Sequence, residues 1–394
     1  MNMLPCFPSV SLGQIAEIDR EGIAPEQIPA GTKYLGLEHI ESGGRILDVA
    51  TVGEGELAST KFRFGPRHLL FGKLRPYLAK IALPDFEGVC STDILPVLPG
   101  DKLDRRYLAH FLRQPSIVDF AASRSTGANL PRLSPKSLAA FAIPLPPLAE
   151  QKRIAAILDQ ADALRRLRRR ALDRLDTLGQ AIFQKMFGAF LSDMGNWPVV
   201  RFGDLVESAK IGVVRAAADL SQDGSIAYLR MDAIQDAGVL HLNALRRTEA
   251  TERERREYSL RPGDLLFNTR NSRELVGKSA VLRERFDGIY NNNILRVRFS
   301  GRASASFVDS FFRTRVGAAA LDVRKSGTTS VFAVYQKALM EMPVPLPPID
   351  LQRRYEGVLD RIAEQRATST RGRTDAEQLF ASLQARAFNG NLQP

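Results

Sequence analysis

The sequence predicts an α+β fold: two similar α/β-mixed domains separated by two long antiparallel helices that form a coiled coil. The two halves are related by an internal pseudo-twofold repeat. Three observations predict this. One segment recurs at an offset of 201 residues. Each copy continues into a stretch of helical periodicity. Each copy also follows about 140 residues in which strand-like apolar runs alternate with Gly and Pro.

The recurring segment spans residues 143–159 (IPLPPLAEQKRIAAILD) and residues 344–360 (VPLPPIDLQRRYEGVLD). Unrelated segments of this length share about one residue, so the similarity indicates a true repeat. Eight of the 17 aligned pairs are identical: Pro144/Pro345, Leu145/Leu346, Pro146/Pro347, Pro147/Pro348, Gln151/Gln352, Arg153/Arg354, Leu158/Leu359 and Asp159/Asp360. Shorter matches lie upstream, including Leu69-Leu70-Phe71 with Leu265-Leu266-Phe267, and Arg124 and Gly127 with Arg324 and Gly327.

The proline clusters divide the chain into four parts, because proline fixes φ and forces its predecessor into an extended conformation. Residues 1–145 form the first mixed domain and 146–190 the first long helix. Residues 191–346 form the second mixed domain, and 347–394 form the second long helix and a C-terminal tail.

The first long helix has apolar residues at steps of three or four, which is the spacing of an amphipathic helix seam. From residue 150 to 187 it would extend ~57 Å. Its predicted seam is Ile154, Ile157, Ala161, Leu164, Leu167, Ala171, Leu175, Leu178, Ile182 and Met186. The arginines at 165, 166 and 168–170 fall largely off the seam, where either a solvated face or a DNA- or partner-binding face would explain them.

The second long helix supplies the other half of the coiled coil. Its predicted seam is Leu351, Tyr355, Val358, Ile362, Leu379 and Leu383. Its middle, residues 365–377, is polar and contains Gly372, which indicates either a bend or contacts with another protein. An antiparallel pairing is expected because the chain passes through a whole domain between the two helices.

Each mixed domain combines predicted strands with a helical stretch near its end. In the first domain the strands are residues 46–52, 69–71 and 94–98, and the helical stretch is 107–120. In the second domain the strands are 264–267 and 294–299, and the helical stretch is 307–323.

The composition favours a polyanionic partner. The chain has 55 Lys and Arg against 44 Asp and Glu, a formal net charge of +11. Basic and amide side chains on polar loops can contact either base edges or phosphates. The predicted DNA-binding residues on such loops are Lys73, Arg75, Arg124, Thr126, Asn129, Arg132, Asn268, Arg270, Asn271, Arg273, Lys278, Arg324, Lys325 and Thr328.

No motif for catalysis or metal binding is present in the sequence. Gly72-Lys73 lacks the spacing of a nucleotide-binding loop, and the two cysteines and four histidines have no partners at metal-ligand spacing. Asp85 and Glu87 faintly resemble a nuclease carboxylate pair, but we interpret them as part of a loop between strands. The N-terminus lacks a leader and no run is long enough to span a membrane, so we expect a cytoplasmic protein.

The chain resembles the specificity subunit of a type I restriction-modification system. The resemblance lies in the duplicated PLPPLAEQKRIAAILD-type segment, in LLFGKLRPYLAKIAL and GDLLFNTRNSRELVGKSAVL, and in SRSTGANLPRLS. It implies two target-recognition domains that each recognise half of a bipartite double-stranded DNA site, and helices that set the spacer.

The same resemblance implies partners and cofactors. Two methyltransferase subunits would dock around the helices, and a restriction and translocase subunit would join them. This chain would bind no cofactor, since S-adenosylmethionine, ATP and Mg²⁺ would belong to the partners. The residues assigned to docking lie at the helix starts: Glu150, Gln151, Arg153, Gln352 and Arg354. The second helix departs from the pattern, with Leu351-Gln352 in place of Glu-Gln.

Two other functions remain open from the sequence alone. Basicity and the Asp85/Glu87 pair are compatible with an enzyme that modifies or cleaves DNA by itself. The long helices are compatible with a coiled-coil scaffold for protein assembly.

Overall fold

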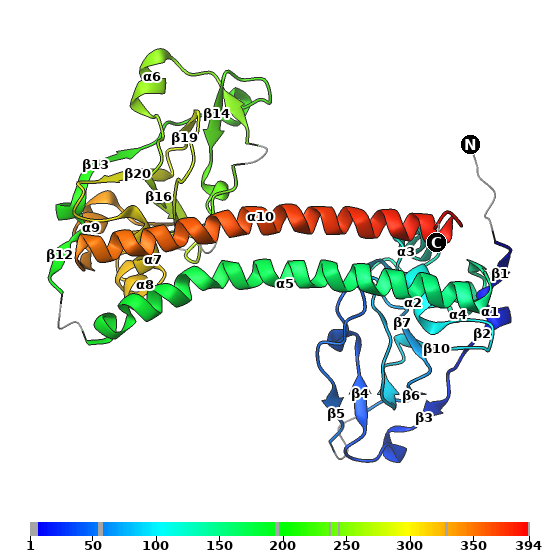
Figure 1. Ribbon diagram of the computed structural model, residues 1–394. Helices are drawn as coiled ribbons and strands as arrows, with labels where there is room; N and C mark the ends of the chain where they lie inside the picture. The colour runs from blue at the N-terminus through cyan, green and yellow to red at the C-terminus, as the bar shows by residue number, and fades with distance from the viewer. Residues whose placement is uncertain are drawn as a thin grey trace. The chain divides into compact units, whose positions relative to one another are not determined.

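The computed structural model describes residues 7–53, 58–193, 197–235, 238–242, 245–327 and 330–392 (Figure 1). Two compact units make up the chain. The first unit is Met1–Arg169 with Gly372–Pro394, and the second unit is Arg170–Arg371. Two long helices, α5 (Leu148–Asp193) and α10 (Ile349–Phe388), each contribute a segment to both units.

The first unit contains short strands and helices that precede α5. Its strands are β1 (Ser9–Ser11), β2 (Ala16–Ile18), β3 (Gly22–Ile23), β4 (Lys33–Leu35), β5 (Ala50–Thr51), β6 (Lys61–Phe64), β7 (Leu69–Gly72), β8 (Ile81–Ala82), β9 (Gly88–Cys90), β10 (Ile94–Pro99) and β11 (Ala142–Pro144). Its helices are α1 (Leu12–Ile15), α2 (Arg105–Leu112), α3 (Pro115–Ser123) and α4 (Pro135–Ala139).

The second unit contains the elements between α5 and α10. Its strands are β12 (Val199–Arg201), β13 (Val206–Ile211), β14 (Ile226–Leu229), β15 (Arg247–Thr248), β16 (Leu265–Asn268), β17 (Arg270–Asn271), β18 (Ser279–Val281), β19 (Gly288–Tyr290), β20 (Ile294–Phe299), β21 (Ser326–Gly327), β22 (Phe332–Ala333) and β23 (Pro343–Pro345). Its helices are α6 (Glu252–Glu257), α7 (Ala305–Phe312), α8 (Arg315–Asp322) and α9 (Gln336–Met340).

The two units share one topology, which confirms the predicted repeat. A four-stranded antiparallel sheet has the order β2-β10-β7-β8 in the first unit and β13-β20-β16-β18 in the second. Each unit also has a parallel pair, β4 with β9 or β14 with β19. In both units the strand before the long helix pairs with the first strand of the unit, β11 with β1 and β23 with β12.

Most of the predicted strands are confirmed, but the prediction for residues 46–52 is wrong for most of its length. Only Ala50–Thr51 is a strand there, and Ile46 makes an isolated bridge to Ile40. Predicted strands 69–71, 94–98, 264–267 and 294–299 correspond to β7, β10, β16 and β20. The apolar run at 46–52 therefore lies mostly in an irregular segment.

Each predicted helical stretch is split into two helices. The stretch 107–120 becomes α2 and α3, and the stretch 307–323 becomes α7 and α8. In the first unit Pro115 begins α3, because proline lacks the N–H that would continue α2 but fits the first position of a new helix. In the second unit Thr314 caps α8 by accepting the Gly317 N–H at 3.0 Å.

A buried glutamine fixes the start of α5 to the first unit. Gln151 is 0% exposed, and its Oε1 accepts the Asp104 N–H at 2.8 Å. Its Nε2 donates to the carbonyls of Lys102 at 2.9 Å and Pro146 at 2.8 Å. The amide oxygen and the amide nitrogen both bond to backbone groups before α2 and in the proline cluster, which fixes the direction in which the helix begins.

The equivalent glutamine makes the same contacts in the second unit. Gln352 is 0% exposed and accepts the Ser304 N–H at 2.9 Å. Its Nε2 donates to the Pro347 carbonyl at 2.8 Å and lies 3.5 Å from the Arg302 carbonyl. The identity of Gln151 and Gln352 in the repeat thus has a structural cause.

Within each unit, segments of α5 and α10 run antiparallel and pack into the domain core (Figure 1). In the first unit Arg153 donates to the Leu392 carbonyl at 2.8 Å, and the buried Phe388 ring lies 5.1 Å from the Tyr107 ring. In the second unit Phe183 lies 5.3 Å from Tyr355, its ring between α5 and α10. The helix segments are therefore part of each domain's core.

The predicted seam is only partly correct. Leu164, Leu167, Leu178 and Leu379 are exposed, so assigning them to the seam is wrong. Leu172 is buried instead, and Phe380 packs against the core of the first unit. The apolar spacing predicts the helix correctly. It does not distinguish residues that pack against the domain from residues that pack against the other long helix. Helix α10 includes Gly372, so this glycine does not end the helix.

The buried glutamine gives a stability prediction that the sole tryptophan, Trp197, can report. Gln352→Leu keeps the size of the side chain but leaves the Ser304 N–H and the Pro347 carbonyl without their partner. We expect the second unit to lose about 2 kcal/mol. The urea midpoint of the Trp197 fluorescence transition should fall by about 1 M.

The matched control is Gln365→Leu, which changes an exposed glutamine of the same helix in the same unit. Its midpoint should stay at the wild-type value. Equal midpoints for the two variants would show that the buried amide does not hold the helix.

Candidate nucleic-acid interface

In the first unit, the two loops predicted to bind DNA lie side by side. The Lys73 N–H donates to the Asp93 carbonyl at 2.9 Å, and the Lys73 carbonyl accepts the Leu133 N–H at 2.9 Å. The Arg75 N–H donates to the Pro131 carbonyl at 2.7 Å. Residues 73–75 and 124–132, about 50 positions apart in sequence, thereby form one edge of the unit. We call this the first recognition edge.

Arg132 connects the parts of this edge. Its guanidinium pairs with the Asp93 carboxylate at 2.9 Å, and this charge-assisted hydrogen bond raises the pKa of Arg132. Arg132 and Thr126 exchange both backbone hydrogen bonds, at 2.9 and 3.1 Å, which closes the loop between them. Gly127 begins the turn at φ +108°, a conformation that side chains with a Cβ rarely adopt.

The loop after β7 contains two residues in the left-handed region that are not glycine. Arg75 has φ 51° and Ala79 has φ 47°. Such a conformation costs on the order of 1–3 kcal/mol at each residue and persists only where surrounding contacts impose it. Here the Ala79 carbonyl accepts N–H groups from Gly43 at 3.2 Å and Ile81 at 3.0 Å. The Arg75 N–H donates to the second loop at the Pro131 carbonyl, and the Arg75 side chain is exposed.

Three of the four remaining predicted residues of the first recognition edge are exposed. Arg124 stacks on Phe120 at 4.8 Å from the ring centroid, which leaves its donors in solvent. Thr126 and Asn129 are also exposed, and Lys73 is partly buried. The edge therefore presents cationic and amide groups together, which is the chemistry that contacts phosphates and base edges.

The second unit brings its predicted loops together in the same way. Strands β17, β22 and β21 form a three-stranded sheet, with Arg270 opposite Ala333 and Ser326 opposite Ala333. Lys325 Nζ donates to the Arg273 carbonyl at 2.8 Å, and the Arg273 guanidinium lies over the Phe332 ring at 5.8 Å. We call this the second recognition edge.

Three predicted residues of the second unit have side chains that serve the fold. Asn268 is 1% exposed and its Nδ2 donates to the Met231 carbonyl at 3.2 Å, so we leave it out of the interface. Arg324 donates to the carbonyls of Ala338, Ala320 and Glu341 at 3.1, 2.6 and 3.2 Å. Asn271 Nδ2 lies 3.8 Å from Met231 Sδ.

The last two predicted residues of this unit are Lys278 and Thr328. Lys278 is partly buried, and its carbonyl accepts the Asn268 N–H at 2.8 Å. Thr328 lies outside the described residues. Arg270, Arg273 and Lys325 are therefore the basic residues placed together at the second recognition edge.

The residues predicted for docking fall into two groups. Gln151 and Gln352 are buried and bonded to the backbone, so they cannot contact a partner, and that assignment is corrected. Glu150 and Arg153 pair through two hydrogen bonds of 2.7 Å, which lower the pKa of Glu150. Arg354 is exposed on α10.

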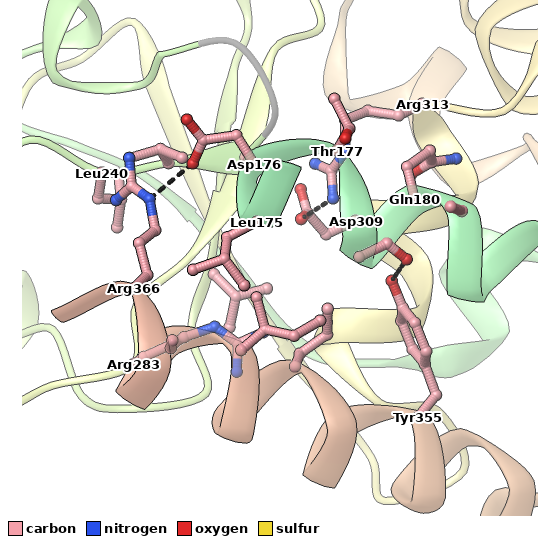
Figure 2. Close-up of a pocket in the computed structure, with 18 of the residues that line it drawn as sticks. Leu175, Asp176, Thr177, Gln180, Leu240, Arg283, Asp309, Arg313, Tyr355 and Arg366 are labelled. Atoms are coloured by element: carbon pink, nitrogen blue, oxygen red, sulfur yellow. Dashed lines mark hydrogen bonds and ion pairs between the residues drawn. The ribbon is translucent and has the colours of Figure 1, made fainter. Parts of the chain in front are cut away.

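A cavity of about 1060 Å³ lies within the second unit, between the two helix segments and the domain (Figure 2). Figure 2 shows Arg313 beside Asp309, with which it pairs at 2.7 Å. Arg313 Nη1 is buried and has no hydrogen-bond partner among the described residues. The walls combine apolar side chains, among them Leu240, Val281 and Leu359, with charged ones, among them Asp176, Arg283 and Arg366.

Acidic residues and histidines are scattered in the described part of the chain. No cluster of three or more His, Cys, Asp or Glu that could hold a metal ion occurs there. Asp85 and Glu87 lie between β8 and β9, which confirms their interpretation as a loop between strands. No described helix is both long and apolar enough to cross a membrane.

Sequence reasoning missed two residues of the first recognition edge. Asp93 orients Arg132, but an isolated acidic residue before a strand has no distinguishing pattern. Leu130 stands exposed in the loop closed by Thr126 and Arg132. Its signal was available in the repeat, since Val331 lies 201 residues later and is also exposed.

Comparison with known proteins gives a family match in the first part of the chain. Residues 9–176 match the family model described as the type I restriction modification DNA specificity domain. The chain is 31% identical over 193 residues to the EcoDI type I restriction enzyme specificity subunit of Escherichia coli, covering 47% of this chain and 43% of that one. It is 26% identical over 308 residues to the EcoKI specificity subunit of Escherichia coli strain K12, covering 73% and 65%.

Solved structures agree in fold. The S subunit of the type I restriction-modification system from M. genitalium has 13% identity and a TM-score of 0.62 over 98% of this chain and 97% of that one. A chain from a structure of type I R-M complex assembly has 19% identity and a TM-score of 0.59, with each chain fully covered. The alignments span 43% and 65% of the two curated relatives' own lengths. The family resemblance seen in the sequence is confirmed.

The first recognition edge gives a prediction about the salt dependence of DNA binding. Removing two charges with Arg75→Gln and Arg124→Gln should weaken duplex DNA binding and lower the slope of log K against log salt concentration by about 1.8, at about 0.9 for each lost phosphate contact. Fluorescence anisotropy at several salt concentrations measures this slope. Lys102→Gln, an exposed charge near the start of α5, should leave it unchanged. Equal slopes in all three proteins would exclude the first recognition edge as a DNA contact.

Proposed function

We propose that this chain, which carries a type I restriction modification DNA specificity domain at residues 9–176, is the non-catalytic DNA-recognition subunit of a type I restriction-modification complex. Each unit would recognise one half of a bipartite site in double-stranded DNA. The observation that carries the proposal is the duplication of the recognition edge. Both units bring two polar, arginine-bearing loops together through the same backbone contacts.

The equivalence of the two edges is visible in single hydrogen bonds. The Lys73 carbonyl accepts the Leu133 N–H at 2.9 Å, and the Thr269 carbonyl accepts the Val334 N–H at 2.9 Å. Two domains with one architecture can each occupy a half-site, as two-fold DNA-binding proteins do. Loops on a rigid sheet can vary their side chains without changing this frame.

We propose that the chemistry belongs to partner subunits. Methyltransferase subunits would supply S-adenosylmethionine, and a restriction and translocase subunit would use ATP and Mg²⁺. Exposed apolar residues on α5 support a docked protein, since Leu164 and Leu167 are 40% and 56% exposed on one helix face. Glu150, Arg153 and Arg354 remain proposed docking residues. We place the complex in the cytoplasm.

Co-expression with the methyltransferase subunit of the same system tests the function. The two proteins should copurify and should methylate one bipartite site, with an unspecified spacer between its halves. Sequencing of methylated positions in DNA from cells with and without the chain measures this. The chain alone should methylate and cleave nothing.

Each alternative function has its own outcome in that experiment. Methylation of unrelated sequences at the same rate would refute sequence recognition. DNA modification or cleavage by the chain alone, abolished by Asp85→Ala, would establish an enzyme. If the two proteins copurify but their complex does not bind DNA, or binds it independently of salt concentration, the chain is a scaffold.

We further propose that α5 and α10 set the length of the unrecognised spacer, because both are unbroken helices shared by the two units. Insertion of four residues near Ala171 in α5 and near Thr370 in α10 would add about 6 Å to both helices, close to the rise of two base pairs. The methylated site should gain about two base pairs of spacer and keep both half-sites.

The matched control inserts the same four residues into only one of the two helices, which prevents the pair from lengthening together. It should reduce methylation without defining a new spacer. An unchanged spacer after the paired insertion would show that the helices do not set it.

A further inference from the structure

Leu130 forms an exposed apolar tip on the first recognition edge, and it recurs. Its side chain is 45% exposed, and that of Val331, at the repeat offset of 201 residues, is 53% exposed. A single exposed leucine on a protein surface carries little information. Exposed aliphatic residues at equivalent positions of two basic edges, however, indicate a shared purpose.

The loop that carries Leu130 is held rigidly. Thr126 and Arg132 close it through two backbone hydrogen bonds of 3.1 and 2.9 Å. The Pro131 carbonyl accepts the Arg75 N–H at 2.7 Å, and the Leu130 carbonyl lies 3.5 Å from Arg132 Nη1. The residues on both sides of Leu130 are held by hydrogen bonds. Little conformational entropy is therefore lost when this loop binds a ligand.

The surroundings of Leu130 favour DNA over an apolar protein pocket. Arg75, Arg124 and Arg132 are exposed on the same pair of loops. Exposed Tyr77 belongs to a short 3-10 helix, η3 (Pro76–Leu78), that begins directly after Arg75. Cationic groups around an apolar centre match a duplex, whose phosphates flank base edges.

Leucine has no hydrogen-bond donor or acceptor, which restricts what it can recognise. In the major groove each base pair presents donors and acceptors, and the 5-methyl group of thymine is the apolar group available there. We propose that Leu130 contacts a thymine 5-methyl group in the half-site bound by the first unit, and is a specificity-determining residue. This inference rests on the proposed function.

Deoxyuridine, which lacks only the 5-methyl group of thymine, tests the contact. Each thymine of the methylated site, on either strand, is replaced singly in a synthetic duplex, and binding by the complex with its methyltransferase subunits is measured. One replacement should weaken binding about fourfold, the effect of one lost methyl contact. Leu130→Ala should weaken binding to the thymine duplex by a similar factor and abolish the effect of that one replacement.

Two variants serve as controls. Leu47→Ala changes an exposed leucine of the same unit, 52% exposed, and should keep the wild-type sensitivity to every replacement. Val331→Ala should abolish sensitivity, where present, only in the other half-site. A wild-type complex without a methylated bipartite site would refute the proposed function, whereas the outcomes below refute only the inference.

Three results would overturn the thymine contact. The first is an undiminished effect of the deoxyuridine replacement in Leu130→Ala. The second is a half-site without A·T pairs, or one in which no single replacement weakens wild-type binding. The third is a Leu130→Ala complex that loses its methyltransferase subunits, because Leu130 would then contact protein.

Discussion

The attachment of each long helix to its domain is the constraint on which both units depend. A proline cluster stiffens the chain before the helix, and one buried amide, Gln151 or Gln352, then satisfies backbone groups on both sides of the junction. An unsatisfied buried amide is costly, so this geometry has few alternatives. The repeat preserves the glutamine because the direction of the helix within each unit depends on it.

The far ends of the helices complete each domain. In the first unit Gln384, from the end of α10, donates to the His110 carbonyl at 3.1 Å. In the second unit Gln180, from the later half of α5, lies 3.5 Å from the equivalent carbonyl of Ser310. Each domain therefore holds one helix by its beginning and another by its end. A recognition edge built on such a domain is fixed relative to the helix segments of its own unit.

The sequence predicted architecture better than side-chain roles. The repeat and the helical periodicity predicted the topology, and the loop positions predicted both recognition edges. The seam failed at Leu164 and Leu167, because spacing alone does not say which face a domain covers. Polarity equally failed to distinguish Asn268 and Gln151, which are buried, from exposed Arg75. Burial depends on contacts between segments far apart in sequence, which one sequence does not show.

The pattern of differences between the two edges has a consequence for the DNA site. The backbone frame is common to both, yet Arg75 corresponds to Asn271 and Arg132 to Ala333. Contacts that maintain the frame are thus shared, while the charged side chains presented at the two edges differ. Because the pattern of side chains at an edge determines which bases it favours, two edges with unlike side chains would not bind identical half-sites equally well. Within the proposed function, this difference favours a bipartite site whose two halves differ in sequence.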